Sequence, residues 1–159
     1  MYFIYAAAAV VLTIADLFVK HIVRINMKIG QTIPVIKDVF HITYAKNTGV
    51  AFSMFADNPE IMTWLTVLLL VLLVGFIIYT RPKNHLVLCS FALMISGGIG
   101  NLINRVTLGY VVDFFDFRLI NFAIFNTADV FIVTGACLFI LHTFLTADRK
   151  GEKSENKSE

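Results

Sequence analysis

Four apolar stretches, separated by segments of mixed character, set the pattern of this chain. They run from Tyr2 to Ile22, from Ile61 to Thr80, from His85 to Val106 and from Ala128 to Leu145. Each is close to the roughly 20 residues that a helix needs to cross a bilayer. The pattern predicts four transmembrane helices in one domain, residues 1–147. The polar residues 148–159 predict a disordered tail.

Two segments between the apolar stretches have the pattern of strands instead. In residues 25–58, Gln31–Ile36 and Val39–Tyr44 carry β-branched and aromatic residues in partial alternation, and in residues 108–126 Gly109–Phe125 is similar. Such runs predict short strands. With four spans, both segments lie on the same side of the membrane. The fold class we expect is an α-helical membrane protein with four transmembrane helices and a small β-sheet.

Composition supports a membrane location and excludes several function classes. The chain has 159 residues, of which 58% are hydrophobic and 15% charged, and its mean hydropathy is +0.78. Soluble domains carry about 25% charged residues. The net charge is only +2, and no basic patch or phosphate-binding loop is present, so we expect no nucleic-acid partner. Motifs of the type HExxH, GxSxG and CxxC are absent from the sequence, so we expect no metal and no cofactor.

The distribution of positive charge indicates only weakly which side of the membrane holds the termini and which holds the β-sheet. One side would hold Arg81, Lys83, Arg149, Lys150, Lys153 and Lys157, and the other Lys20, Arg24, Lys28, Lys37, Lys46, Arg105 and Arg118. The first set lies in shorter segments that are denser in charge. Because positive charge is retained in the cytoplasm, we expect both termini to be cytoplasmic and the β-sheet to be extracytoplasmic.

Polar residues that are unusual at membrane depth gather at one end of the predicted bundle. By the parity of the four spans, the end of the first, the start of the second, the end of the third and the start of the fourth share one leaflet. The polar residues there are Asp16, Lys20, Asn47, Asn101, Arg105, Asp113, Asn126 and Asp129. This placement predicts a functional site at the extracytoplasmic end.

Two of these residues, Asp113 and Asp129, lie in apolar, aromatic-rich stretches. A carboxylate near a bilayer costs several kcal/mol and is retained mainly for a role inside the bundle. Two neighbouring carboxylates can share one proton and activate a water. The alternative is that they are helix caps, since Asp129 falls in a first helical turn and Asn126 is a good N-cap. Capping leaves Asp113, between Val-Val and Phe-Phe, unexplained.

Asp16 and Lys20 are four residues apart, with the acid first, which is the favourable order for a helical ion pair. We expect a structural pair near the membrane interface, with Lys20 extending outward to the headgroups. The alternative is that one of them also holds a substrate group. The segment Asn47-Thr48-Gly49 has the pattern of a turn.

The third apolar stretch contains Gly97, Gly98 and Gly100, which permit close approach of another helix. Asn101 and Arg105 follow and share one helical face. An arginine here binds a lipid phosphate or a carboxylate through two hydrogen bonds, or it only anchors the span at the interface.

Together these residues resemble a known family, the bacterial lipoprotein signal peptidases (signal peptidase II). The resemblance covers nearly the whole chain, and each motif is weak alone, whereas the ordered set is specific. The motifs are Asp16-x-x-x-Lys20, Asn47-x-Gly49-x-Ala51-Phe52, Gly97-x-x-Gly100-Asn101-x-x-x-Arg105, Val112-Asp113-Phe114 and Phe125-Asn126-x-Ala128-Asp129.

The resemblance implies an aspartyl endopeptidase of the bacterial cell membrane, with its active site at the extracytoplasmic face and without a cofactor. Such enzymes remove the signal peptide from prolipoproteins, on the N-terminal side of a cysteine that carries a diacylglyceryl group. Asp113 and Asp129 match the catalytic residues. Membrane lipids are further partners, and we expect a monomer. The positions that match residues around the site are Asn47, Gly49, Asn101, Arg105, Asn126 and Ala128.

One position departs from the family pattern. The family usually has an aspartate where this chain has Asn104, directly before Arg105. The catalytic pair is unaffected, but a potential partner of Arg105 or of another cation is lost. One alternative is therefore a weak or inactive homologue that binds lipoproteins. The buried acids and the arginine leave a second one open, a small ion- or proton-handling membrane protein.

Overall fold

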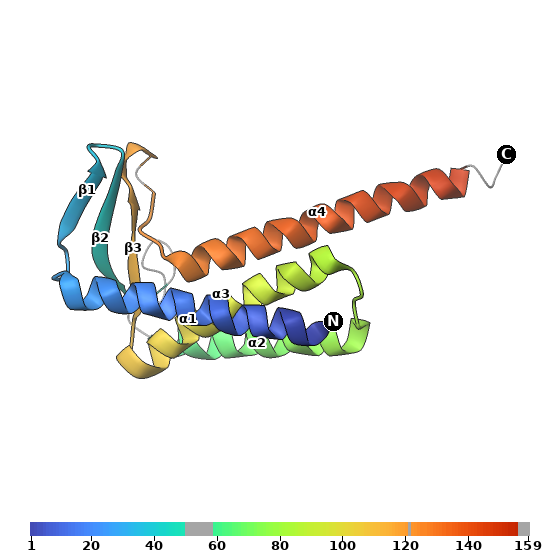
Figure 1. The fold of residues 1–159 in the computed structure, drawn as a ribbon, viewed down its shortest axis with the longest axis horizontal. Coiled ribbons are helices and arrows are strands. Elements are labelled where there is room, and N and C mark those ends of the chain that lie inside the picture. The colour runs from blue at the N-terminus through green and yellow to red at the C-terminus, as the bar shows by residue number, and fades with distance from the viewer. Residues whose placement is uncertain (50–58, 121, 156–159) are drawn as a thin grey trace.

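The computed structural model describes residues 1–49, 59–120 and 122–155 and has four long helices with a small sheet at one end (Figure 1). All four helices are long and apolar enough to cross a membrane. The predicted fold class is therefore confirmed. The helices are α1 (Tyr2–Asn26), α2 (Pro59–Thr80), α3 (His85–Leu108) and α4 (Thr127–Glu155), and the strands are β1 (Thr32–Ile36), β2 (Phe40–Asn47) and β3 (Val111–Phe117).

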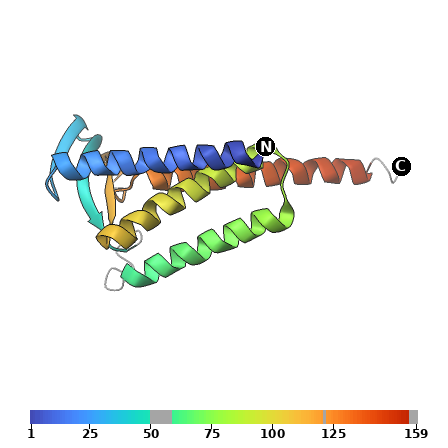
Figure 2. The same cartoon turned by 60° about the horizontal axis from the view of Figure 1, so that its bottom comes forward.

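Helix α3 lies at the centre of the bundle and contacts each of the other three helices. Figure 2 shows it crossing obliquely between α1 and α2. Glycines make its contact with α4 very close, as the sequence predicts: a Cβ atom on Gly97 would collide with the backbone oxygen of Ala128, and one on Gly135 would collide with that of Ser90. Small residues at these crossings let the backbones touch.

Local signals fix both ends of α3. The side chain of Asn84 accepts hydrogen bonds from the backbone N–H groups of Leu86 (2.8 Å) and Val87 (3.3 Å), so it is an N-cap. At the other end Gly109 has a left-handed conformation, with φ of 78°, and its N–H donates to the carbonyl of Arg105. Glycine is the usual residue for such a C-cap. The turn then directs the chain into β3.

The three strands form an antiparallel sheet in the order β1-β2-β3, set across the end of the bundle (Figure 1). An apolar cluster joins the sheet to the last turn of α1; its buried members are Val23, Met27, Tyr44, Val112 and Phe114. β3 is the strand nearest the helices, and it is buried along most of its length. The sheet therefore carries Asp113 to the end of the bundle where α1, α3 and α4 meet.

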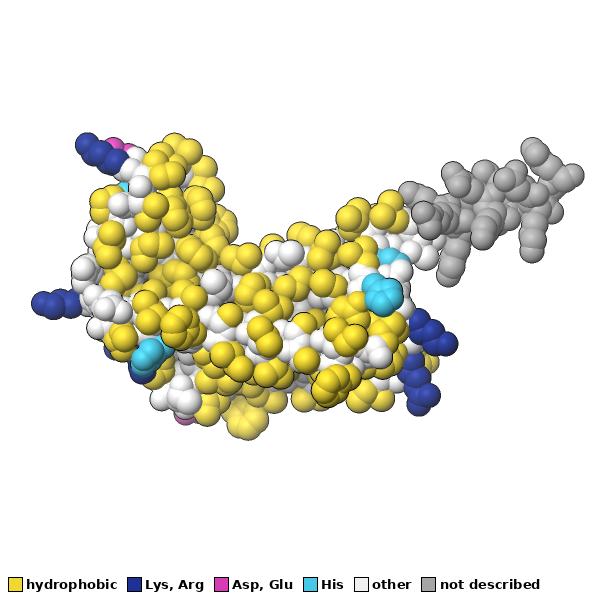
Figure 3. Space-filling view, in the orientation of Figure 1, with side chains coloured by type: hydrophobic (Ala, Val, Ile, Leu, Met, Phe, Trp, Pro, Cys, Tyr) yellow, Lys and Arg dark blue, Asp and Glu magenta, His cyan; other side chains and the backbone are white. Residues whose placement is uncertain are grey.

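The membrane-facing surface is visible in the space-filling view (Figure 3). On the face shown, hydrophobic side chains cover most of the bundle, and lysine and arginine side chains stand out at its two ends. Large apolar residues such as Phe18, Trp64 and Leu69 are exposed, which suits a lipid environment.

Two predictions differ from the structure. Helix α4 continues to Glu155, so residues 148–155 are helical rather than disordered. The reason lies in Ala147, Lys150, Glu152 and Lys153, because Ala, Lys and Glu have high helix propensity. The strand-like segment Gly109–Phe125 forms a strand only over Val111–Phe117 and continues as a 3₁₀ turn, Arg118–Ile120.

Candidate active site

Asp113 lies in the middle of β3, opposite Ala45 of β2, and is only 1% exposed. Two side-chain amides hold its carboxylate. The Nδ2 of Asn47 donates to Oδ2 over 2.8 Å, and the Nδ2 of Asn126 donates to Oδ1 over 2.5 Å. Each carboxylate oxygen thus has one donor, which fixes the plane of the group.

Asp129 lies in the first turn of α4 and is partly buried. It forms a reciprocal capping arrangement with Asn126: the N–H of Asn126 donates to Oδ2 of Asp129 (3.1 Å), and the N–H of Asp129 donates to Oδ1 of Asn126 (3.2 Å). The remaining oxygen, Oδ1, accepts from the Nδ2 of Asn101 over 2.8 Å. The carboxylate of Asp129 is therefore held by the N-cap of its own helix, α4, and by Asn101 of α3.

Asn126 connects the two acids directly. Its side-chain oxygen caps α4 beside Asp129, and its side-chain nitrogen binds Asp113. The preceding residue, Phe125, is tied to β3, because its carbonyl accepts from the N–H groups of Phe114 (2.9 Å) and Phe115 (2.8 Å). The capping interpretation and the paired-carboxylate interpretation are thus compatible: the cap is what brings Asp129 to Asp113.

The buried setting changes the acidity of Asp113. Burial raises the pKa of its carboxyl from 3.8 to about 6, and the nearby charge of Asp129 adds to the rise. The amide donors of Asn126 and Asn47 and the charge of Lys20 oppose it. A carboxyl group that titrates just below neutral pH beside a second carboxylate is suited to acid–base chemistry.

Asp16 and Lys20 form the expected ion pair, but the predicted direction of Lys20 is wrong. Its Nζ lies 2.8 Å from Oδ2 of Asp16, and the two side chains are 1% and 0% exposed. Lys20 also donates to Oδ1 of Asn101 over 2.8 Å. The ammonium points inward because the bundle supplies two acceptors there. Through Asn101 this pair is connected to Asp129.

Two contacts with Asp16 were not predicted from the sequence. The hydroxyl of Thr127 donates to Oδ1 of Asp16, which ties the start of α4 to α1. Gly100 lies against the same carboxylate, since a Cβ on it would meet Oδ2 of Asp16. Thr127 follows a recognisable N-cap, but no local signal indicates a partner 111 residues earlier in the chain.

The turn predicted at Asn47 is present, with a second role. Oδ1 of Asn47 accepts from the N–H of Gly49 (3.0 Å) while its nitrogen binds Asp113, and Gly49 is buried. Ala51 and Phe52 of the same motif lie outside the described residues. Ala128 is fully buried against α3.

Arg105 lies where two cavities meet. The first, which we call the helix cavity, has about 420 Å³ between α2, α3 and α4 and is mostly apolar, with walls that include Leu70 and Ile132. The second, the loop cavity, has about 490 Å³ beside α4 and residues 122–125. Arg105 and Asp129 line both. The buried Nε of Arg105 has no hydrogen-bond partner among the described residues, which leaves a donor for an incoming group.

Asn104 points elsewhere. Its Oδ1 accepts from the N–H of Val112 over 3.1 Å, directly before Asp113. Asn104 lines a different pocket, together with Lys20 and Arg24. It lines neither of the two cavities that Arg105 lines. Within the described ranges, no group of His, Cys, Asp and Glu is arranged to hold a metal ion.

Comparisons with known proteins identify the family of the chain. A family profile described as signal peptidase (SPase) II matches residues 8–145. A lipoprotein signal peptidase of Nostoc sp. is 40% identical over 134 residues, which is 84% of this chain and 85% of that protein. One from Streptococcus thermophilus is 42% identical over 126 residues, or 79% of this chain and 82% of its own.

Two solved structures share the fold. A bacterial membrane enzyme superposes with a TM-score of 0.85 at 32% identity and covers 92% of this chain and 90% of its own. Another bacterial membrane enzyme gives a TM-score of 0.79 at 33% identity, with coverage of 87% and 91%.

Proposed function

The chain belongs to the signal peptidase II family, as its motifs indicated, and we propose that it removes the signal peptide from lipoprotein precursors by an aspartyl mechanism. The observation that supports this mechanism is the aspartate pair, Asp113 and Asp129, joined through Asn126 at the sheet end of the bundle. Family membership favours this peptidase over the small ion-handling protein that composition alone left open.

In the proposed reaction the two carboxyls share one proton. The ionised carboxylate takes a proton from a water, which attacks the scissile carbonyl carbon, and the protonated carboxyl donates to the carbonyl oxygen. The proton taken from the water then passes to the leaving amine as the C–N bond breaks. The raised pKa of Asp113, about 6, keeps such a half-protonated pair accessible near neutral pH.

The surrounding amides support the aspartate pair rather than react. Asn47, Asn101 and Asn126 each donate to one carboxylate, so they fix its orientation. Both Asn47 and Asn126 have their own side-chain oxygens occupied by backbone N–H groups, and neither amide can flip without losing that bond. The site is therefore preorganised before substrate binds.

The two cavities that Asp129 lines suit a substrate with lipid tails and a signal helix. The apolar helix cavity would receive the acyl chains of a diacylglyceryl group, and the loop cavity would receive the extended peptide around the scissile bond. The free Nε of Arg105 would bind an ester or peptide oxygen where the two cavities meet. Substrate binding then comes largely from lipid burial.

Asn104 favours an active enzyme over an inactive homologue. A side-chain oxygen at this position accepts the N–H of Val112, and asparagine supplies that oxygen as well as aspartate would. The aspartate pair does not depend on a carboxylate there. We also propose that the aspartate pair faces the extracytoplasmic side, with both termini cytoplasmic, and that the enzyme acts as a monomer.

The test is cleavage of a diacylglyceryl-modified precursor by the purified protein in nanodiscs, beside the same precursor without lipid. We expect cleavage of the lipidated form alone. Asp129→Asn should abolish it, whereas the matched control Asp116→Asn, on the same strand as Asp113 but bonded to Thr43 and Arg118, should retain it. Turnover by Asp129→Asn would refute the aspartyl mechanism, and equal cleavage of the unlipidated precursor would refute the substrate class.

A further inference from the structure

A second polar pocket lies between α1 and α3, beside Val112, on the other side of α3 from Arg105's cavities. This head pocket has about 150 Å³, and its polar walls are Lys20, His21 and Arg24 from α1 with Asn104 and Thr107 from α3. It shares no lining residue with the helix cavity or the loop cavity. It is therefore separate from the proposed peptidase site.

The charge and hydrogen-bonding character of the head pocket is one-sided. Arg24 is the unpaired cation, since the charge of Lys20 is paired with Asp16, and no carboxylate is among the residues that line the pocket in the described part of the chain. The amide of Asn104 adds a donor, because its oxygen is held by the N–H of Val112 and its nitrogen has no partner among the described residues. The guanidinium of Arg24 together with a free N–H group favours an anion with several oxygens, such as a phosphate.

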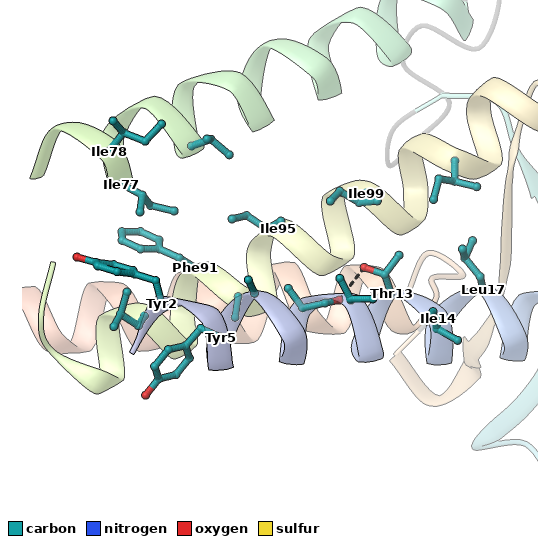
Figure 4. Close-up of a pocket in the computed structure, with 17 residues that line it drawn as sticks. Tyr2, Tyr5, Thr13, Ile14, Leu17, Ile77, Ile78, Phe91, Ile95 and Ile99 are labelled. Carbon is teal, nitrogen blue, oxygen red and sulfur yellow. Dashed lines mark hydrogen bonds between the residues drawn. The ribbon is translucent and has the colours of Figure 1, made fainter. Parts of the chain in front are cut away.

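An apolar groove continues from this pocket toward the other end of the bundle. This tail groove has about 490 Å³ between α1, α2 and α3, and it shares Leu17 and Ile103 with the head pocket. Figure 4 shows its walls, from Leu17 and Ile14 to Tyr2. The 15-residue distance along α1 from Leu17 to Tyr2 corresponds to about 22 Å of helix, which is long enough for an extended acyl chain.

The polar groups along the tail groove are already satisfied. The hydroxyl of Thr13 donates to the carbonyls of Ala9 (2.9 Å) and Ser96 (3.3 Å). At the far end the hydroxyl of Tyr2 donates to the carbonyl of Pro82 (2.8 Å). The groove thus offers an occupant apolar contact alone, whereas the head pocket offers charge and donors.

We propose that the head pocket and tail groove together bind one anionic phospholipid, with its phosphate at Arg24 and Asn104 and one acyl chain along α1. The order of polar and apolar parts fits a membrane. The head pocket lies at the sheet end of α1, at the level of the headgroups, and the groove runs from there into the hydrocarbon region. The occupant is a structural lipid and not the substrate.

The test is native mass spectrometry of the intact protein with three probes. These are dioleoyl phosphatidylglycerol, dioleoylglycerol with the same tails, and inorganic phosphate. We expect tight retention of the phospholipid alone. Arg24→Gln should weaken it about fivefold, whereas the matched control Lys28→Gln, a basic residue outside the pocket, should not. Ala6→Phe should fill the tail groove and reduce retention, whereas Ala7→Phe, the neighbouring residue outside the groove, should not.

Each contrary outcome overturns a stated part of the proposal. Equal retention of dioleoylglycerol would show that the head pocket contributes nothing. Phosphate bound as tightly as the phospholipid would indicate a plain anion site. Phospholipid retention that neither Arg24→Gln nor Ala6→Phe reduces would place the lipid elsewhere. Cleavage of the precursor is scored separately, so failure here leaves the peptidase assignment standing.

Discussion

Replacing Asp113 by asparagine tests two properties of this carboxyl separately, its role in cleavage and its effect on the stability of the fold. The change keeps the size of the side chain and removes its charge. General acid–base catalysis contributes roughly 10²–10⁴-fold to a rate, so Asp113→Asn should reduce cleavage at least by that factor. The protein should remain folded, because the oxygen of an asparagine at this position still accepts from one of the two surrounding amides.

The same substitution should change how stability depends on pH. The folded-state pKa of Asp113, about 6, lies above the reference value of 3.8. The folded protein thus binds this proton more tightly than the unfolded chain does. That stabilisation is fully present below about pH 3.8 and is lost as pH rises through about 6. At about 1.36 kcal/mol per pKa unit, the loss is about 3 kcal/mol in order of magnitude.

A second effect lowers the stability of Asp113→Asn at every pH. Asn47 and Asn126 both present N–H donors to Asp113, and both are fixed by other bonds. An asparagine at position 113 accepts one of them and turns its own N–H group toward the other. An unsatisfied buried donor costs about 1–3 kcal/mol. The variant is therefore destabilised at low pH and recovers relative to wild type as pH rises.

The measurement is thermal unfolding in detergent for both proteins at about pH 4 and about pH 8, with precursor cleavage assayed in parallel. Wild type should lose more stability than Asp113→Asn between the two conditions. Parallel pH dependence would refute the assigned pKa, and substantial cleavage by the variant would refute the catalytic role.

Three further changes test the supporting contacts. Asn126→Ala should reduce kcat and lower stability by about 1–2 kcal/mol through loss of the cap; unchanged kcat in the cleavage assay would contradict its bridging role. Lys20→Met should destabilise by about 3–5 kcal/mol because Asp16 is left charged and buried, and adding Asp16→Asn should restore much of the melting temperature. Gly100→Ala should lower the melting temperature, whereas Gly75→Ala, with open space around it, should raise it slightly.

Features with a local cause were predictable from the sequence. The apolar stretches fix the four spans, and the parity of those spans places the unusual polar residues at one end. Asn126 is recognisable as an N-cap from its position before an apolar helix. Its second bond, to Asp113, depends on how β3 returns to α4 and has no local signal.

Side-chain direction inside the bundle was not predictable. Lys20 has an acid four residues before it, and that pattern is the same for a pair facing lipid headgroups and for one facing inward. The deciding partner, Asn101, is 81 residues away in the chain. The extension of α4 was missed for a different reason: charge and polarity in the tail suggested disorder, although its residues favour helix.

The hydrogen bonds between β3 and Phe125 make the position of the aspartate pair independent of the length of the segment that precedes Phe125. The carbonyl of Phe125 accepts from the N–H groups of Phe114 and Phe115, and its N–H donates to the carbonyl of Phe115, so the two ends of the chain between residues 116 and 124 are held together. Insertions or deletions within that segment leave the separation of Asp113 and Asp129 unchanged. We therefore expect changes of length in this segment to alter the wall of the loop cavity without displacing the two aspartates.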